Sequence, residues 1–319
     1  MVYRTCVAVA LGTVLASARA EFVTLETRIE LPGTAGRLDH LAVDLTTNRL
    51  FIAALGADTV EVVDLQARRR VWSVPAAREP QGVAFAHGRL FVASGEGGNV
   101  QVFEGERAVS TVRELPDADN LRLTVDKRLL FIGYGQGMAV LDTRTLAIVW
   151  RAPLSGHPEA FELSPDGSRV YVNVPTSHAV EVLDAKTGAR VAFWSIAPLG
   201  ANYPMALDIA GGRLFVATRT PASLLVIDLR DGRQLQRLAL CGDADDLLLD
   251  ARRERLYAVC GGGELRVLST READRYVVVQ RVATTPGART GLFVPELDRL
   301  FIASPQRAHA AEVLIYRPQ

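Results

Sequence analysis

The sequence has no excess charge of either sign, no long hydrophobic run after its first twenty residues, and only three cysteines. Its 36 basic residues balance its 36 acidic residues, so no overall field draws the chain onto nucleic acid or anionic lipid. No stretch is long and apolar enough to cross the roughly 30 Å of a bilayer core. We therefore expect no nucleic-acid partner and no membrane span.

Several catalytic and cofactor motifs are absent. The chain has no Gly-x-Ser-x-Gly elbow for a serine nucleophile, no His-Glu-x-x-His or His-x-His metal pattern, and no Cys-x-x-Cys-His for haem attachment. Three glycine-rich segments resemble phosphate loops, but each lies between two strand patterns, so no helix N-terminus follows to bind a phosphate. We interpret them as hairpin turns: Gly95–Gly98, Gly133–Gly137 and Gly261–Gly263.

The first twenty residues differ in composition from the rest of the chain. Arg4 provides a short positive start, residues 6–15 are apolar, and Ala18-Arg19-Ala20 is a small-x-small cleavage pattern. This order is typical of a secretory signal peptide. We predict cleavage after Ala20 and a mature protein that is periplasmic or secreted.

One strand pattern recurs seven times along the chain. Each copy carries Phe or Tyr between aliphatic residues, most often after Arg and before a small residue. Successive aromatic residues are 40, 40, 40, 44, 42 and 44 positions apart, which is the length of a propeller blade. These aromatic residues are Phe51, Phe91, Phe131, Tyr171, Phe215, Tyr257 and Phe301.

Each copy of the repeat contains four short strand patterns separated by turns. An apolar strand such as Phe161–Leu163 comes first, and a polar turn such as Ser164–Gly167 leads into the aromatic strand. A third strand alternates and ends at Asp, as in Val180–Asp184, and an apolar fourth strand follows, as in Arg70–Val74. No helical period of adequate length lies between them. We therefore predict an all-β, seven-bladed propeller with four-stranded blades.

The two ends of the chain complement each other. After the seventh aromatic residue, Ala311–Tyr316 is a third strand, and the sequence stops without a fourth. A surplus strand, Phe22–Ile29, precedes the first copy. If the surplus strand completes the last blade, the ring closes and no long edge is left unpaired. We expect this closure, with residues 21–319 forming a single domain.

The residues around the fourth copy suggest a family. They resemble the YVTN/YncE-like β-propellers, and the likeness extends over the mature chain as a repeat pattern. The Trp-Asp pair of WD40 blades is absent. The resemblance implies architecture and leaves the ligand open, because propellers of this kind serve many functions. The segments that carry it are Ser164-Pro165-Asp166-Gly167-Ser168-Arg169-Val170-Tyr171-Val172 and Val182-Leu183-Asp184-Ala185-Lys186-Thr187-Gly188.

Removal of the signal peptide leaves two cysteines, Cys241 and Cys260. The first precedes the sixth innermost strand and the second ends the antiparallel aromatic strand, so both fall near neighbouring strand ends. An even pair in an exported protein favours a disulfide. We predict a bond that holds the loop containing Asp243, Asp245 and Asp246, with two buried free thiols or a soft-metal site as alternatives.

The segments that lead into the innermost strands are rich in charged and amide side chains. Innermost strands line the central channel of a propeller, so these segments meet at one end of it, here called the channel mouth. Ligand sites favour such concave positions, and we predict a polar, net acidic pocket there. Its candidate residues are Arg37, Asp39, His40, Glu79, Gln81, Asp119, Asn120, His157, Glu159, Asn202, Tyr203, Asp243, Asp245, Asp246 and Arg289.

Three functions follow from this reading. The favoured one is a non-catalytic binding scaffold, expected to be monomeric, which holds a small-molecule ligand or a partner protein at the channel mouth. The second is a metal-dependent lactonase or other hydrolase, in which a divalent cation activates water. The third is a docking subunit of a quinone-cofactor or haem redox complex, although no cofactor motif is present. The candidate metal ligands are His40, His157, Glu159 and Asp245.

Overall fold

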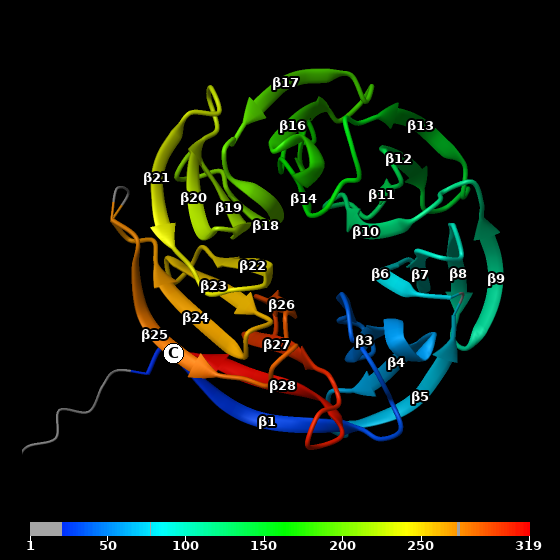
Figure 1. Cartoon of the computed structure of the whole chain (residues 1–319). Coiled ribbons are helices and arrows are strands. Elements are labelled where there is room, and N and C mark those ends of the chain that lie inside the picture. The colour runs from blue at the N-terminus through cyan, green and yellow to red at the C-terminus, as the bar shows by residue number, and fades with distance from the viewer. Residues whose placement is uncertain (1–20, 77, 273–274) are drawn as a thin grey trace, which may run out of the picture.

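A computed structural model describes residues 21–76, 78–272 and 275–319 as seven four-stranded antiparallel sheets arranged in a ring (Figure 1). The predicted all-β, seven-bladed propeller is therefore confirmed. The predicted signal peptide lies outside the described residues. Within these residues, two short 3-10 helices, Leu55–Ala57 and Pro175–Ser177, interrupt the strand pattern. No helix in the described ranges is long and apolar enough to cross a membrane.

Six blades each consist of four consecutive strands, numbered from the channel outwards. Blade 1 contains β2 (Leu41–Asp44), β3 (Arg49–Ala54), β4 (Thr59–Asp64) and β5 (Arg69–Pro75). Blade 2 contains β6 (Pro80–Ala86), β7 (Arg89–Ser94), β8 (Asn99–Glu104) and β9 (Arg107–Val112). Blade 3 contains β10 (Ala118–Leu123), β11 (Leu129–Tyr134), β12 (Gly137–Asp142) and β13 (Ile148–Pro153).

The second half of the ring follows the same order. Blade 4 contains β14 (Phe161–Leu163), β15 (Arg169–Val174), β16 (Ala179–Asp184) and β17 (Arg190–Ser195). Blade 5 contains β18 (Gly200–Asp208), β19 (Arg213–Thr220), β20 (Ala222–Asp228) and β21 (Gln234–Ala239). Blade 6 contains β22 (Ala244–Asp250), β23 (Arg255–Cys260), β24 (Glu264–Ser269) and β25 (Val277–Ala283).

Blade 7 is built from both ends of the chain. It contains β26 (Thr290–Val294), β27 (Arg299–Ser304) and β28 (Ala311–Pro318), and β1 (Val23–Leu31) supplies its outermost strand. Register runs from Val23 opposite Pro318 to Leu31 opposite Ala311. The side-chain oxygen of Gln280 in blade 6 accepts hydrogen bonds from the backbone N–H of Phe22 and Val23, at 2.7 and 2.8 Å. The predicted closure by the N-terminal strand is thus observed.

The recurrent aromatic residues lie in the second strand of each blade and form the core between blades. All seven are at most 6% exposed. Phe215 of β19, for example, packs edge to face against Tyr276 of blade 6, with ring centroids 5.3 Å apart. It shares a buried cluster with Leu256 of β23. Because each blade buries its apolar surface against the next, the repeat directly encodes the ring. The three glycine-rich segments are hairpin turns, as predicted.

Candidate functional site

The innermost strands become irregular where they reach the channel mouth. Strand pairing shifts register in β6, β10, β18 and β22 at their mouth ends. A bulge bends the strand and redirects its side chains out of regular alternation. Several predicted site residues therefore lie inside irregular strands, and not in loops that precede them, as the sequence pattern suggested. These residues are Gln81, Asp119, Asn120, Asn202, Tyr203, Asp245 and Asp246.

Arginines and aspartates from four blades form the outer part of the mouth. Arg219 Nη2 lies 3.2 Å from Asp243 Oδ1 and also forms an ion pair with Asp245. Arg289 Nη2 lies 3.2 Å from Asp243 Oδ2, and Arg37 Nη2 lies 3.9 Å from Asp245 Oδ2. Blades 1, 5, 6 and 7 thus contribute charges to one cluster, which brings together residues far apart in the sequence.

Asp39 connects this cluster to the interior of the channel. Its side chain is 1% exposed, and Arg37 Nη2 lies 2.8 Å from its Oδ2 atom. That geometry is an ion pair without a hydrogen bond, because Oδ2 has no hydrogen-bond partner among the described residues. Burial raises the pKa of Asp39 well above its usual range, and Arg37 only partly opposes this. Asp39 is a buried carboxyl group with an unused acceptor.

His157 is a second charged centre, on the opposite wall. Its Nδ1 atom lies 3.2 Å from Asp117 Oδ2 and 3.0 Å from the carbonyl oxygen of Gly135, while Nε2 lies 3.8 Å from Asp119 Oδ2. Burial alone would lower its pKa, but Asp119, Asp117 and Glu159 outweigh burial and raise the pKa to about 9. His157 is therefore an imidazolium at neutral pH.

Glu159 and Asp246 are acids that hold their protons. Burial, reinforced by Asp119, raises the pKa of Glu159 to about 8. Burial also raises the pKa of Asp246 to about 8, although its Oδ2 atom accepts a hydrogen bond of 2.8 Å from the backbone N–H of Gly291. Near neutral pH these two groups act as hydrogen-bond donors more often than as anions.

His40 lies deeper, between carboxyl groups that do not hydrogen-bond to it. Nε2 is 3.9 Å from Asp39 Oδ1 and 4.0 Å from Asp119 Oδ1, and Nδ1 is 4.0 Å from Asp246 Oδ2. Burial lowers the pKa of His40 to about 4, so the ring is neutral at pH 7. The channel therefore contains a cationic histidine near its rim and a neutral one in its interior.

Three other predicted residues contribute differently. Glu79 and Gln81 gather around Gly95 in blade 2, together with Asp117. Asn202 is fully buried and donates hydrogen bonds of 3.0 and 2.9 Å to Asn173 Oδ1 and the carbonyl oxygen of Ala179. Asn202 therefore fastens blade 5 to blade 4, and its side chain is fully buried.

The sequence reasoning missed Arg219, Arg122 and Glu162. Arg219 lies near the end of β19, which is longer than the aromatic strands of the other blades. Its Cζ atom lies 3.9 Å from the centroid of the Tyr203 ring. Arg122 follows the predicted Asn120 by two residues, and strand side chains alternate, so the period of two would have found Arg122. Glu162 lies three residues after the predicted Glu159, in β14, and that period does not reach it. Both side chains line the channel cavity.

The predicted metal ligands do not form a coordination group. Among the described residues, no three or more His, Cys, Asp or Glu side chains converge so that they could hold one ion. Of the four candidates, His157 is engaged by Asp117 and Asp119, and Asp245 by Arg219. Metal binding therefore stays a prediction that this geometry does not favour.

The predicted disulfide between Cys241 and Cys260 is present, with the two Cα atoms 6.0 Å apart. Cys260 ends β23 and pairs with Ala244 of β22, directly beside Asp243. The bond therefore anchors the segment that carries Asp243 and Asp245, as expected from the sequence. It stabilises the most charged part of the mouth.

Comparisons with known proteins concern the fold. A family model described as outer membrane protein assembly factor BamB matches residues 56–196, less than half of the chain. A solved structure of Kuenenia stuttgartiensis hydrazine synthase is similar, with a TM-score of 0.75 over 89% of this chain and 98% of that chain. Both matches support a β-propeller family. Sequence identity to the solved structure is 17%, so the likeness shows the fold alone. No curated protein matches this chain.

Proposed function

We propose that this chain is an exported, monomeric binding scaffold of the YVTN/YncE-like type. Residues 1–20 would direct export to the periplasm or beyond, and residues 21–319 would form the functional domain. The mouth holds a small-molecule ligand or a loop of a partner protein. The disulfide supports an oxidising compartment. The partial match to a family named for outer-membrane protein assembly is compatible with that location.

One observation carries the proposal: buried ionisable groups from several blades converge at the mouth, where the apolar packing of the ring does not require them. Burying charges costs free energy unless every polar atom finds a partner. Asp39 Oδ2 and Arg289 Nε have no hydrogen-bond partner within the described part of the chain. Apolar packing between the repeats is enough to close the ring. A ligand that forms hydrogen bonds with these two atoms would therefore explain why charged side chains occupy these positions.

The charges at the mouth suggest what the ligand carries. Arg37 is 44% exposed at its side chain and Asp243 is 36% exposed, so groups of both signs face solvent. A zwitterionic small molecule, or a protein loop that bears both signs, can pair with both. A ligand with charge of only one sign would leave either the arginines or the aspartates of the cluster without a partner on the ligand.

Thermal-shift measurements on residues 21–319 test the small-molecule form. The twenty amino acids, small dicarboxylates and diamines are the probes, with an Arg37→Gln/Arg289→Gln double variant and an exposed control, Arg113→Gln/Arg144→Gln. A probe that raises the unfolding temperature of the wild type and control but not of the mouth variant supports the proposal.

The partner form is tested by affinity capture from periplasmic extract with the same three proteins. A protein retained by the wild type and the control but lost with the mouth variant supports a scaffold. If neither a probe nor a partner depends on the mouth residues, the proposal fails.

The alternative, a metal-dependent hydrolase or lactonase, has its own test. Metal analysis of the purified protein should then find one divalent ion, lost in His40→Ala or Glu159→Ala, together with lactone or ester turnover. Metal-free protein without turnover would remove this alternative and leave the scaffold proposal standing.

A further inference from the structure

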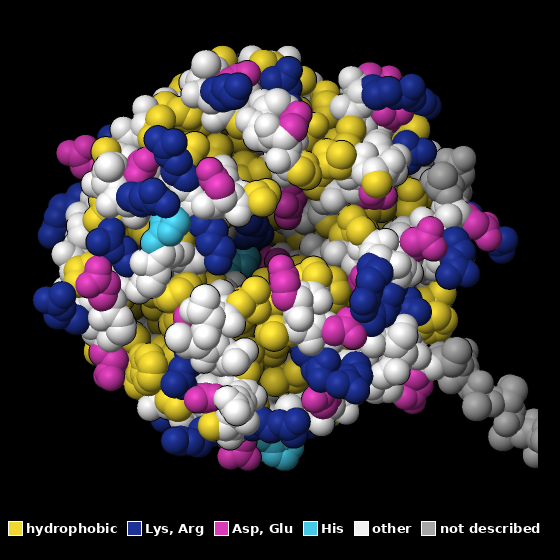
Figure 2. Space-filling view, turned by 180° about the vertical axis from the view of Figure 1, so that it is seen from behind, with side chains coloured by type: hydrophobic (Ala, Val, Ile, Leu, Met, Phe, Trp, Pro, Cys, Tyr) yellow, Lys and Arg dark blue, Asp and Glu magenta, His cyan; other side chains and the backbone are white. Residues whose placement is uncertain are grey.

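Two connected cavities lie at the end of the channel opposite the mouth. One, of about 420 Å³, occupies the channel below His40, between the innermost strands and the turns that follow them. The other, of about 540 Å³, is a groove between blades 3 and 4. Arg122, Leu123 and Glu162 line both, so the cavities meet at these residues. Figure 2 shows one face of the ring hollowed at its centre, with charged side chains along the wall.

The wall of the groove between blades 3 and 4 is apolar and open to solvent. Val125 is 87% exposed and Val149 is 53% exposed, which is unusual for valine. Trp150, Leu163 and Pro165 complete the wall. The volume falls within the range of small-molecule pockets, which combine an apolar lining with a few polar groups.

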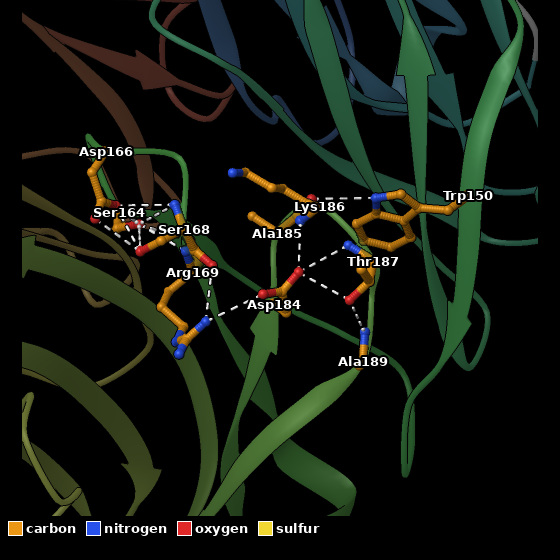
Figure 3. Close-up of polar contacts among 10 residues, drawn as sticks. All are labelled: Trp150, Ser164, Asp166, Ser168, Arg169, Asp184, Ala185, Lys186, Thr187 and Ala189. Atoms are coloured by element: carbon orange, nitrogen blue, oxygen red, sulfur yellow. Dashed lines mark hydrogen bonds and ion pairs between the residues drawn. The ribbon is translucent and has the colours of Figure 1, made fainter.

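The blade 4 side of the groove is held rigid by its own turns (Figure 3). Asp166 Oδ1 accepts hydrogen bonds from Ser164 Oγ at 2.6 Å and from the backbone N–H of Ser168 at 3.0 Å. Trp150 Nε1 donates to the carbonyl oxygen of Ala185 at 3.2 Å, which fixes the indole across the blade boundary. The groove is therefore formed before any ligand arrives, which lowers the entropic cost of binding.

The cavities also contain cations without acidic partners. Arg122 donates to Asn120 Oδ1 at 3.3 Å and to the carbonyl oxygen of Leu121 at 3.0 Å, yet no carboxylate lies within ion-pair distance of it in the described ranges. The chain has only two lysines, Lys127 and Lys186. Lys127 lines the channel cavity and Lys186 lines the groove, and neither forms an ion pair with any described residue.

The acids nearest to Arg122 form no ion pair with it among the described residues. Burial raises the pKa of Glu162, which Arg122 opposes, and burial raises the pKa of Asp246 to about 8, so Asp246 favours the protonated form at neutral pH. His40 is neutral as well, because burial lowers its pKa to about 4. The junction of the cavities therefore holds a guanidinium without an ion-pair partner in the described part of the chain, next to an apolar groove.

We infer that these cavities bind an amphipathic carboxylate, whose head group contacts Arg122 and whose apolar body lies in the groove between blades 3 and 4. A guanidinium with free donors matches a carboxylate in geometry and charge. The solvent-exposed valines and Trp150 can pack against the alkyl or aromatic body of the ligand. The channel cavity reaches His40 and Asp246, but Arg122 and the groove are distinct from the arginines of the mouth, so either proposal can fail without the other.

Titration calorimetry with decanoate below its micelle concentration tests the inference on the mature protein. Decanol tests the need for the charge, decyltrimethylammonium reverses the charge, and acetate removes the apolar body. We expect decanoate to bind at least about tenfold more tightly than each of the other three. Equal affinity for decanoate and decanol, or no binding of decanoate, would overturn the inference.

Two variants with different effects locate the site. Arg122→Gln removes the head-group contact, and Val149→Glu places a negative charge on an exposed strand position in the groove. Each should weaken decanoate binding by about tenfold or more. Arg113→Gln, which removes a charge from an exposed site outside both cavities, should leave binding unchanged.

Thermal unfolding confirms that each variant is folded. Val149→Glu keeps the test decisive if Arg122→Gln does not fold, because Val149 is half exposed and outside the core. Decanoate binding that survives Val149→Glu unchanged would mean that the ligand lies elsewhere, for example at the arginines of the mouth, and would refute the inference.

Discussion

The second strand of each blade repeats one sequence pattern, whereas the segment that leads into the innermost strand differs from blade to blade. The second strands share one pattern and bury their aromatic residues almost completely. The mouth segments share no pattern, and four of the innermost strands are bulged there. The repeat therefore stabilises the ring, while departures from it supply chemistry. Substitutions in the two regions should separate stability from binding.

The largest expected effect is in the second strands. Phe215→Ala removes a fully buried ring that packs on Tyr276 and should cost about 3–5 kcal/mol of unfolding free energy. Phe193→Ala makes the same chemical change at a side chain that is 46% exposed, and should cost less than about 1 kcal/mol. Urea unfolding measures both. Equal costs would contradict the assignment of the core to the second strands.

The disulfide comes next, since it joins the two regions. Replacing both Cys241 and Cys260 by Ala should lower the unfolding free energy by about 3 kcal/mol, because the bond closes a loop with a sequence separation of 19. Denaturant unfolding measures the loss. Thiol titration of oxidised, denatured wild type is the companion measurement, and two reactive thiols there would contradict the bond.

The protonated groups of the mouth predict how stability changes with pH. The pKa of Glu159 is raised from 4.5 to about 8 and that of His157 from 6.5 to about 9, so the folded chain binds these protons more tightly than the unfolded chain. Stability should therefore fall as pH rises from 6.5 to 8, by up to about 1.4 kcal/mol per pH unit for each group.

Glu159→Gln isolates the contribution of that carboxyl group. It should make the decline between pH 6.5 and 8 shallower, with His157 still contributing to the remainder. Chemical unfolding at several pH values measures the slopes. An unchanged slope in the variant would show that Glu159 ionises normally in the folded protein.

The smallest effect on stability is expected from the outer charges of the mouth. Arg289 pairs with Asp243 at 3.2 Å, and both side chains are partly exposed. Arg289→Gln should change the unfolding free energy by less than about 1 kcal/mol, because exposed ion pairs contribute little. Urea unfolding measures the change. A loss of unfolding free energy near that of Phe215→Ala would show that the charged cluster stabilises the fold. The mouth and the second strands would then not differ in their contribution to stability.

The fold could be predicted from the sequence because an aromatic residue recurs at the spacing of a propeller blade and each blade packs on the next. The disulfide followed from strand order, since Cys241 and Cys260 flank an antiparallel pair. The mouth was only partly predictable. Positions of Asp119 and Asp245 depend on bulges, which leave no repeating signal. Asn202 was predicted as a ligand-binding residue, and its contacts across two blades had no signal in the sequence.

The role of Arg219 was not visible either, because it lies beyond the end of an otherwise regular aromatic strand. Its contacts to Asp243 and Asp245 cross from blade 5 to blade 6. Such contacts depend on the rotation of one blade relative to its neighbour. A sequence pattern within one blade does not specify that rotation. Burial of His40 and Glu159, and hence their altered pKa values, follows from the same packing.

The seam in blade 7 joins segments that are remote in the sequence. Among the described strands, β1 comes first in chain order and its partner β28 comes last. Gln319 Nε2 donates to Thr24 Oγ1 at 2.9 Å across a sequence separation of 295. Contacts this remote form late and slow the completion of a fold. The ring therefore stays open until both β1 and β28 are available, and a circular permutation that moves the seam to another blade would preserve every strand pairing.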